Sequence, residues 1–149
     1  MNKQTVHVKR LHADAILPQY GSEFAAGADL YALCEEEFVS IAPGETKLIR
    51  TGFAIEIPVG YAGFIYARSG IATKRGLAPA NKVGVVDSDY RGEVMVALHN
   101  HSNTVQQIAK GERIAQMVIA PYLTCIFEEA DELDDTERGA GGFGSTGRQ

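Results

Sequence analysis

The sequence predicts an all-β sandwich or barrel, and three observations support this fold class. Glycine (16 residues) and proline (5 residues) interrupt the 149-residue chain at short intervals. The segments between them are short and rich in Val, Ile, Phe and Tyr, which is the pattern of strands joined by turns. No segment carries a long apolar stripe at the helical period of about 3.6 residues. We therefore expect many short strands and one very short helix.

Each expected element lies between turn signals. Residues 46–57 partly alternate apolar and polar side chains, as a half-buried strand does. The helix is expected at Ser69–Arg75, because a serine at the start and Gly76 after the end are helix-end signals. The expected strands, in chain order, are Thr5–Lys9, Asp29–Ala32, Phe38–Ile41, Thr46–Ile57, Tyr61–Ala67, Val83–Val86, Glu93–Asn100, Arg113–Ile119 and Thr124–Phe127.

The chain divides into a β domain at residues 1–127 and a C-terminal segment at residues 128–149. A length of 149 residues favours one domain over two small ones. Residues 128–137 hold seven acidic and no basic side chains, whereas residues 1–127 hold 12 of each sign. The neutral body lacks the basic stripe of a nucleic-acid-binding domain, so no nucleic acid is expected as a partner.

The chain is expected to be cytoplasmic, with no membrane partner. No segment approaches the ~18 apolar residues of a membrane span, and the polar N-terminus lacks the apolar core of a signal peptide. Cys34 and Cys125 are isolated, so we expect neither a zinc site nor a disulfide. The four histidines form no metal-ligand pattern with carboxylates.

The last residues form a flexible, glycine-rich arm by composition. Residues 139–149 include five glycines, and their single aromatic residue is Phe143. Such a segment cannot pack a core. It is either a frayed tail or a phosphate cradle, because backbone N–H groups, the hydroxyls of Ser145 and Thr146, and the guanidinium of Arg148 suit phosphate.

Two short segments carry residues that suit phosphate chemistry. Arg68 precedes Ser69 and Gly70, where a strand leads into the short helix, and a helix N-terminus with an adjacent guanidinium favours phosphate. The plainer interpretation is a serine cap beside a surface arginine. In the second segment, residues 81–92, two β-rich runs flank the turn DSDYRG, which predicts a hairpin with Asp87 where its first strand ends.

Asp87 is either a turn residue that bonds its own backbone or a carboxylate that orients and deprotonates water. Tyr90 is either a core residue or a platform for a sugar. Asp29 starts a strand after small residues and is, on local grounds, a strand-edge residue. Gln116 is a polar residue inside an apolar run, so its amide needs a partner.

Together, and in this order, these segments resemble the homotrimeric dUTPases (deoxyuridine triphosphate nucleotidohydrolases). Five motifs of that family are present over essentially the whole chain: AAGADLYA at 25–32, YARSGIATK at 66–74, NKVGVVDSDYRGE at 81–93, KGERIAQMVI at 110–119 and RGAGGFGSTGR at 138–148. The resemblance implies a jelly-roll-like subunit, a homotrimer and active sites built from three chains. It also implies hydrolysis of dUTP to dUMP and pyrophosphate, which keeps uracil out of DNA and supplies dUMP for dTMP synthesis.

The resemblance assigns roles to individual residues. Asp87 would orient the water that attacks the α-phosphorus, and Tyr90 would pack under the deoxyribose and leave no room for a 2′-hydroxyl. Uracil would be read by the segment that contains Asn81, Gly84, Val85 and Val86, with Met95 lining the base pocket. The phosphates would be held by Arg68, Ser69, Gly70 and Gln116 of one neighbouring chain and by Arg138, Gly142, Ser145 and Thr146 of another.

The arm would close the site, with Phe143 stacked on uracil. The implied cofactor is Mg²⁺, held mainly by the triphosphate and contacted by Asp29 through bound water. Two alternatives stay open: a dCTP deaminase-like enzyme of the same fold, which uses a glutamate at the base, and a non-catalytic nucleotide sensor. Product analysis separates them, because a dUTPase releases dUMP and pyrophosphate, a deaminase releases ammonia, and a sensor turns nothing over.

Overall fold

The computed structural model describes residues 3–144 and confirms an all-β, jelly-roll-like chain with one short helix. Its elements are β1 (His7–Arg10), β2 (Gln19–Tyr20), β3 (Ala28–Tyr31), β4 (Phe38–Ile41), β5 (Thr46–Arg50), β6 (Phe53–Glu56), β7 (Tyr61–Tyr66), α1 (Ser69–Arg75), β8 (Leu77–Pro79), β9 (Gly84–Val86), β10 (Met95–Asn100), β11 (Gln106–Ala109) and β12 (Arg113–Pro121).

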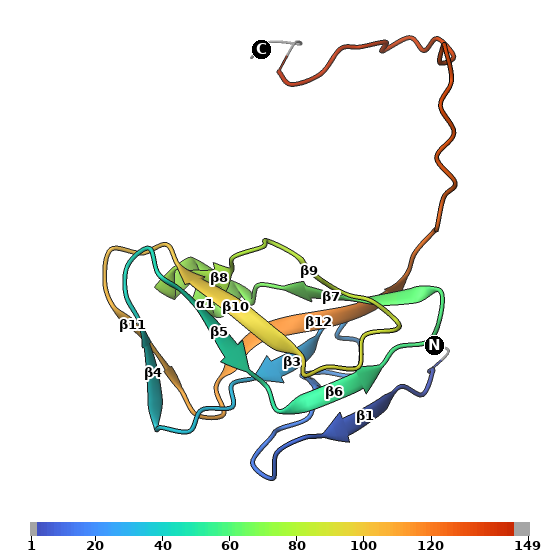
Figure 1. The fold of residues 1–149 in the computed structure, drawn as a ribbon. Coiled ribbons are helices and arrows are strands. Elements are labelled where there is room, and N and C mark those ends of the chain that lie inside the picture. Colours follow the sequence, from blue (N-terminus) through green and yellow to red (C-terminus); the bar gives the residue numbers. More distant parts are fainter. Residues whose placement is uncertain (1–2, 145–149) are drawn as a thin grey trace.

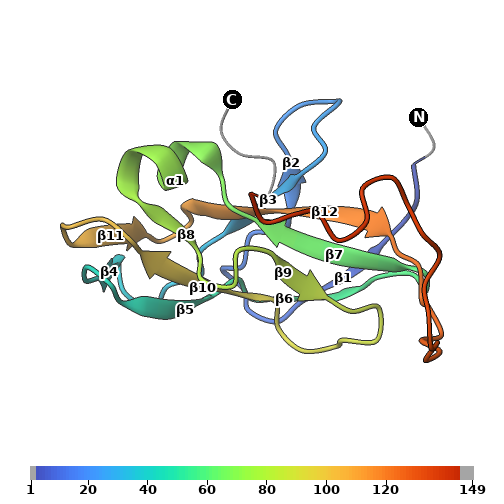
Figure 2. The ribbon, with the colours of Figure 1, turned by 90° about the horizontal axis from the view of Figure 1, so that it is seen from above.

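Two layers of antiparallel strands make up the body (Figures 1 and 2). The larger sheet has the order β2-β3-β12-β7-β9, and the sheet β5-β10-β8 forms much of the other layer. The pairs β1-β6 and β11-β4 complete the strands of the described chain. Because β9 is the last strand of the larger sheet, one of its edges has no strand partner.

The core lies between these layers and takes large side chains from nearly every strand. Among the fully buried ones are Leu30 of β3, Ile41 of β4, Phe53 of β6, Leu98 of β10 and Ile114 of β12. Burying one side chain of this size stabilises the fold by roughly 1.5–3 kcal/mol. This shared core therefore sets how the strands that carry the polar site residues are placed.

The expected single strand at residues 46–57 is two strands. The chain turns at Thr51 and Gly52, after which β5 pairs with β10 and β6 pairs with β1. Gly52 has φ +76°, and a Cβ there would lie 2.7 Å from the Cβ of Ala15. A side chain at this position would therefore be both strained and overlapped, which explains the glycine inside an otherwise β-rich run.

Other strand predictions differ from the structure in two ways: one expected strand is missing, and three short strands are additional. The expected strand Thr124–Phe127 is absent, and Ile126 and Phe127 are almost fully exposed. Their apolar pattern therefore has no partner within residues 3–144. Three strands, β2, β8 and β11, were not expected, because they are only two to four residues long and carry polar or proline residues.

The predicted hairpin across residues 81–92 is wrong. β9 pairs with β7 in the larger sheet, whereas β10 pairs with β5 and β8 in the smaller one. Residues 87–94 therefore cross from one layer to the other instead of joining two paired strands. The turn signal was correct, since the amide of Tyr90 donates to the carbonyl of Asp87 at 3.2 Å.

Helix α1 has the predicted bounds but a different N-cap. Arg68 occupies the cap position with extended backbone, and no side chain caps the helix, so Ser69 is its first residue rather than its cap. Gly76 ends the helix with φ +67°. The guanidinium of Arg75 bonds Glu112 and the Gln107 carbonyl, which attaches the last turn of the helix to the turn between β11 and β12.

Beyond β12 the chain leaves the body as an extended, exposed segment (Figure 1). The acidic residues 128–137 lie in it and are all exposed. In the part of the chain that the structure describes, no helix has the length and apolar character needed to cross a membrane. Cys34 is buried, Cys125 is exposed, and both are free thiols. Burial raises the pKa of the Cys34 thiol.

Candidate active site

A pocket of about 270 Å³ opens between the two layers, where the edge strand β9 faces β5 and β10. It brings together every body residue assigned to the base, the sugar and the water: Asn81, Gly84, Val85, Val86, Asp87, Tyr90 and Met95. These residues come from β9, from the crossing segment 87–94 and from the start of β10. Their gathering in one cavity makes this pocket the candidate active site.

Four further residues line the pocket and were not predicted. They are Leu48 of β5, Ile65 of β7, and Glu93 and Val94 before β10. Of these four, Leu48 stands out in the structure, because it is an apolar side chain on a strand of the body and yet is 60% exposed. Its sequence surroundings, KLIR, do not distinguish it from an ordinary strand residue. Leu48, Glu93 and Val94 come from the other layer, whereas Ile65 lies beside Gly84 in the same sheet as β9.

Strand β9 presents backbone groups to the pocket. Gly84 lies against β7, where a Cβ would be 3.2 Å from the Cβ of Ile65, so the glycine permits this close approach. Lys82 has φ +66°, and the amide of Val83 donates to the carbonyl of Asn81 at 2.7 Å. This tight turn starts a strand whose outer edge is unpaired in the larger sheet. Its N–H and C=O groups are free to bond a planar polar ligand.

The carboxylate of Asp87 lies at the end of β9 and is exposed. Within residues 3–144 it forms no ion pair and no side-chain hydrogen bond, although its carbonyl accepts the Tyr90 amide. An ionised carboxylate offers about four acceptor positions and no donor. Asp87 is therefore placed to accept a hydrogen bond from water at the pocket mouth.

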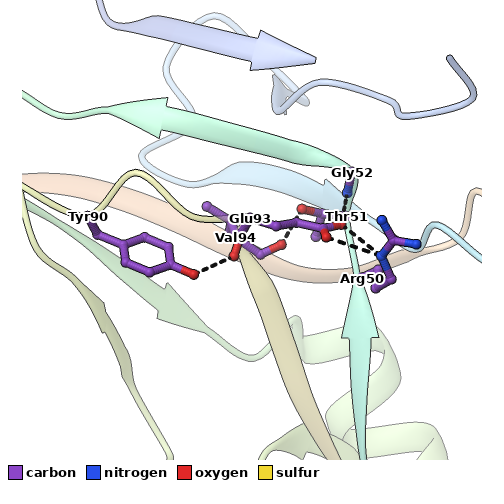
Figure 3. Close-up of polar contacts among 6 residues, drawn as sticks. All are labelled: Arg50, Thr51, Gly52, Tyr90, Glu93 and Val94. Carbon is purple, nitrogen blue, oxygen red and sulfur yellow. Dashed lines mark hydrogen bonds and ion pairs between the residues drawn. The ribbon is translucent and has the colours of Figure 1, made fainter. Parts of the chain in front are cut away.

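The ring of Tyr90 is 42% exposed and is held at its hydroxyl end. That hydroxyl donates to the carbonyl of Glu93 at 2.8 Å (Figure 3). Gly92 lies beside the ring, where a Cβ would be 2.5 Å from the Tyr90 oxygen. Tyr90 is therefore part of the pocket wall rather than a core residue, and its role as a platform for a sugar stays a prediction.

A second polar cluster surrounds Asp29 on β3. The Nε of Arg68 donates to one carboxylate oxygen at 2.7 Å, and Arg113 lies 3.4 Å from the other. The amide of Gln116 donates to the carbonyl of Ala67 at 2.9 Å, so the prediction that Gln116 has a partner is confirmed. Ser69 and Gly70 follow directly and are exposed, with no described neighbour within 4 Å of a Cβ built on Gly70.

The Asp29 cluster and the pocket lie on opposite faces of the larger sheet. Gln116 pairs with Asp29 on one side and with Tyr66 on the other, so these three side chains share a face. The alternate residues of the same strands point into the core, including Leu30, Ala115, Met117 and Ile65. Since Ile65 and Val86 line the pocket, the Asp29 cluster is on the outer face of the sheet. One chain therefore cannot present both groups to one small ligand.

The arm residues do not meet the pocket of their own chain. Arg138 bonds the carbonyl of Gly141 at 2.8 Å within a local turn, and a Cβ on Gly142 would be 3.5 Å from that guanidinium. Phe143 is fully exposed and has φ +50°. Ser145 and Thr146 lie outside the described residues.

Within the described residues, no three His, Cys, Asp or Glu side chains gather where they could hold a metal ion. Asp29 has both oxygens engaged by arginines, yet each oxygen keeps a further lone pair for water. Any cation beside Asp29 would therefore be met through its bound water rather than ligated directly by the carboxylate.

Comparison with known proteins identifies the family. The dUTPase family model matches residues 13–147. The chain is 53% identical to the deoxyuridine 5′-triphosphate nucleotidohydrolase of Nautilia profundicola, over 95% of this chain and 97% of that protein. It is 46% identical to the protein of the same name from Syntrophotalea carbinolica, over 99% of both chains.

Solved structures agree with the fold. A mutant of the Staphylococcus bacteriophage 80alpha dUTPase with dUpNHpp superposes with a TM-score of 0.88 at 29% identity, covering 98% of this chain and all of that one. A mutant dUTPase from the S. aureus phage phi11, described with a structural Mg(II) ion, gives a TM-score of 0.79 at 25% identity, covering 89% of this chain and all of that one. By sequence over nearly its full length and by fold, the chain belongs to the dUTPase family.

Proposed function

We propose that this chain hydrolyses dUTP to dUMP and pyrophosphate, in sites shared between the subunits of a homotrimer, with Mg²⁺ as cofactor and in the cytoplasm. The observation that carries the proposal is the Asp87 carboxylate, which has no side-chain partner among residues 3–144, at the mouth of a pocket edged by β9. Membership of the dUTPase family gives the substrate class. Incubating the protein and Mg²⁺ with each dNTP and with UTP, followed by product analysis, tests it: dUMP and pyrophosphate should form from dUTP alone.

The uncovered edge of β9 suits recognition of uracil. Its backbone donors and acceptors match a base with a 4-oxo group and an N–H, whereas the 4-amino group of cytosine would mismatch them. Gly84 and Ile65 both line this part of the pocket, and we expect the methyl group of thymine to be excluded there by size. Met95 and Leu48 would cover the faces of the base from the opposite layer.

The chemistry would take place beside Asp87. Its carboxylate would accept a proton from a water molecule as that water attacks the α-phosphorus, and the bond from this phosphorus to the bridging oxygen of pyrophosphate would break. Bound Mg²⁺ would neutralise part of the triphosphate charge and stabilise the pyrophosphate that leaves. This chain would contribute Asp29 as a contact to the waters of that ion, and arginines to the phosphate oxygens.

A subunit arrangement in which neighbours complete each site follows from the two faces of the larger sheet. The Asp29 cluster faces away from the pocket of its own chain, so we expect a second chain to bring its own Arg68 and Ser69 to that pocket. The outer face also carries Phe64 and Val118, which are paired across β7 and β12 and only partly buried. These apolar side chains support burial of this face against a neighbour.

The extended segment supports the same arrangement. Leu123 is 85% exposed, Ile126 97% and Phe127 96%, and the last two lie in residues 124–127, where the sequence predicts a strand. Exposed apolar residues so close together are typical of a surface that a partner covers. The arm beyond them would then reach a third chain, where Phe143 would stack on the base and Arg138 would contact phosphate.

The protein is therefore expected to be a trimer of about 48 kDa, three times the 16.1 kDa of one chain. Light scattering coupled to size exclusion measures this mass directly. Dilution provides the control, because specific activity should fall together with the trimer fraction if the sites are shared. A stable monomer with full activity would contradict shared sites.

Replacement of Tyr90 by Ala is expected to raise hydrolysis of UTP relative to dUTP. The ring forms a wall of the pocket, and its removal would open space for a ribose 2′-hydroxyl. The measurement is the ratio of kcat/KM for dUTP to that for UTP. An unchanged ratio would mean that another residue excludes ribose.

Deamination of dCTP is disfavoured by the state of the pocket glutamate. Glu93 is the glutamate that lines the pocket, and its carboxylate is engaged by Arg50 and by the amide of Gly52. A deaminase needs a glutamate free to exchange protons with the base. Here the free carboxylate is Asp87, which suits the activation of water.

A further inference from the structure

Glu93 connects the pocket wall to the turn between β5 and β6. One oxygen of its carboxylate accepts the amide of Gly52 at 2.7 Å, and the other lies 3.1 Å from the Nε of Arg50 (Figure 3). The Glu93 side chain is only 15% exposed, whereas that of Arg50 is 46% exposed. A charged acceptor bonded to a backbone amide in this sheltered place forms a strong contact.

The turn that receives Glu93 is closely packed. Gly52 has φ +76°, and the space where a Cβ would lie is filled by Ala15 and Leu33. The next residue of the crossing segment is bonded to the same turn: the amide of Val94 donates to the carbonyl of Phe53 at 2.9 Å, and the hydroxyl of Thr51 donates to the carbonyl of Val94.

The backbone of Glu93 also holds the side chain of Tyr90. Its carbonyl accepts the Tyr90 hydroxyl at 2.8 Å, which is the one hydrogen bond that this hydroxyl forms within residues 3–144. Since the ring is 42% exposed, packing alone does not fix it. The direction of the ring therefore depends on where the carbonyl of Glu93 is held. The Glu93 carboxylate holds it from the side chain, together with the backbone bond from Val94 to Phe53.

We propose that Glu93 is a positioning residue: its carboxylate, bonded to Gly52 and Arg50, places the Tyr90 ring and so sets the preference of the pocket for deoxyribose over ribose. This inference rests on the proposed role of Tyr90 in excluding a 2′-hydroxyl. Glu93 would not contact the nucleotide sugar itself. It would act through the position of its own backbone carbonyl.

The test compares the ratio of kcat/KM for dUTP to that for UTP in the assembled, full-length protein. Glu93→Ala should lower this ratio about tenfold, the effect of losing one sheltered hydrogen-bond partner. Glu93→Gln keeps an oxygen that can accept the Gly52 amide, so its ratio should remain closer to that of the unmodified protein. If Glu93→Ala does not fold, Glu93→Asp gives the same test, because its shorter side chain keeps the charge but falls short of Gly52.

Glu45 provides a matched control for general destabilisation. Its carboxylate likewise accepts a backbone amide, that of Ala42 at 2.7 Å, and lies 3.6 Å from the ammonium of Lys47, but it does not line the pocket. Glu45→Ala should leave the sugar ratio unchanged even where it lowers the Tm. A fall in the ratio for both variants would show that lost stability, not positioning, is responsible, and would overturn the proposal.

A double-mutant cycle with Tyr90→Ala separates this proposal from the role of Tyr90. In the Tyr90→Ala background, Glu93→Ala should change the ratio no further. If Tyr90→Ala lowers the ratio but Glu93→Ala alone does not, Tyr90 reads the sugar without help from Glu93 and the inference is wrong. If Tyr90→Ala itself leaves the ratio unchanged, the proposed role of Tyr90 fails, and the inference fails with it.

Discussion

Replacement of Asp87 by Asn should lower turnover of dUTP at least ~10²-fold while nucleotide binding survives, which is the lower range for loss of a general base. The amide has nearly the shape of the carboxylate but cannot take a proton from water. Asp87 is exposed and carries no ion pair within the described chain, so the substitution should leave the fold intact. Single-turnover kinetics measures the chemical step, and equilibrium binding of a non-hydrolysable dUTP analogue measures affinity.

Asp89→Asn is the matched control for this experiment. Asp89 belongs to the same turn and is exposed, but it lines a different cavity, on the side of His7 and Glu56. Its substitution removes the same charge two residues away and should leave turnover nearly unchanged. Near-normal turnover of Asp87→Asn, or an equal loss in both variants, would remove Asp87 from its proposed role.

Deletion of residues 138–149 should abolish most turnover and leave a folded trimer that binds nucleotide weakly. The described part of this segment packs against nothing in the body, so its loss exposes no core. Without the arm the site stays open to water and loses the cationic contact of Arg138. Turnover should fall at least ~10²-fold, as for the loss of one placed donor to a developing charge. Wild-type turnover of the shortened chain would contradict any role for the arm.

Closure of the arm can be followed separately with Phe143→Trp. The chain contains no tryptophan, so the introduced indole is the only such reporter. Adding a non-hydrolysable dUTP analogue should change its fluorescence, because Phe143 is fully exposed in the free chain and would stack on the base. Leu133→Trp, in the exposed acidic segment, is the control and should not respond.

Local sequence signals were sufficient where one segment decides its own structure. Helix α1 and strand β4 have the predicted bounds, because glycine, serine and proline mark their ends. The sequence predicts one strand at residues 46–57, whereas the structure has two. The break lies at Gly52, where Ala15 and Leu33, both distant in sequence, leave no room for a side chain. No local pattern contains that information.

The site could be predicted as a set of residues but not as an arrangement. The pocket gathers Asn81, Asp87, Tyr90 and Met95 as the family motifs imply. The position of Asp29 on the outer face depends on the register of β3 against β12, in which a shift of one residue would turn its side chain inward. Leu48 and Glu93 were missed because the sequence predicts a hairpin at this segment. In the structure, residues 87–94 cross between the layers, and this crossing brings Leu48 and Glu93 to the pocket.

Hydrolysis of dUTP in ¹⁸O-labelled water tests the central proposal most directly. Attack of an Asp87-activated water on the α-phosphorus predicts that each molecule of dUMP carries one ¹⁸O atom and that pyrophosphate carries none, as read by mass spectrometry or ³¹P NMR. Label in pyrophosphate would mean attack at the β-phosphorus. Ammonia from dCTP, or no product from any nucleotide, would contradict the proposed activity itself.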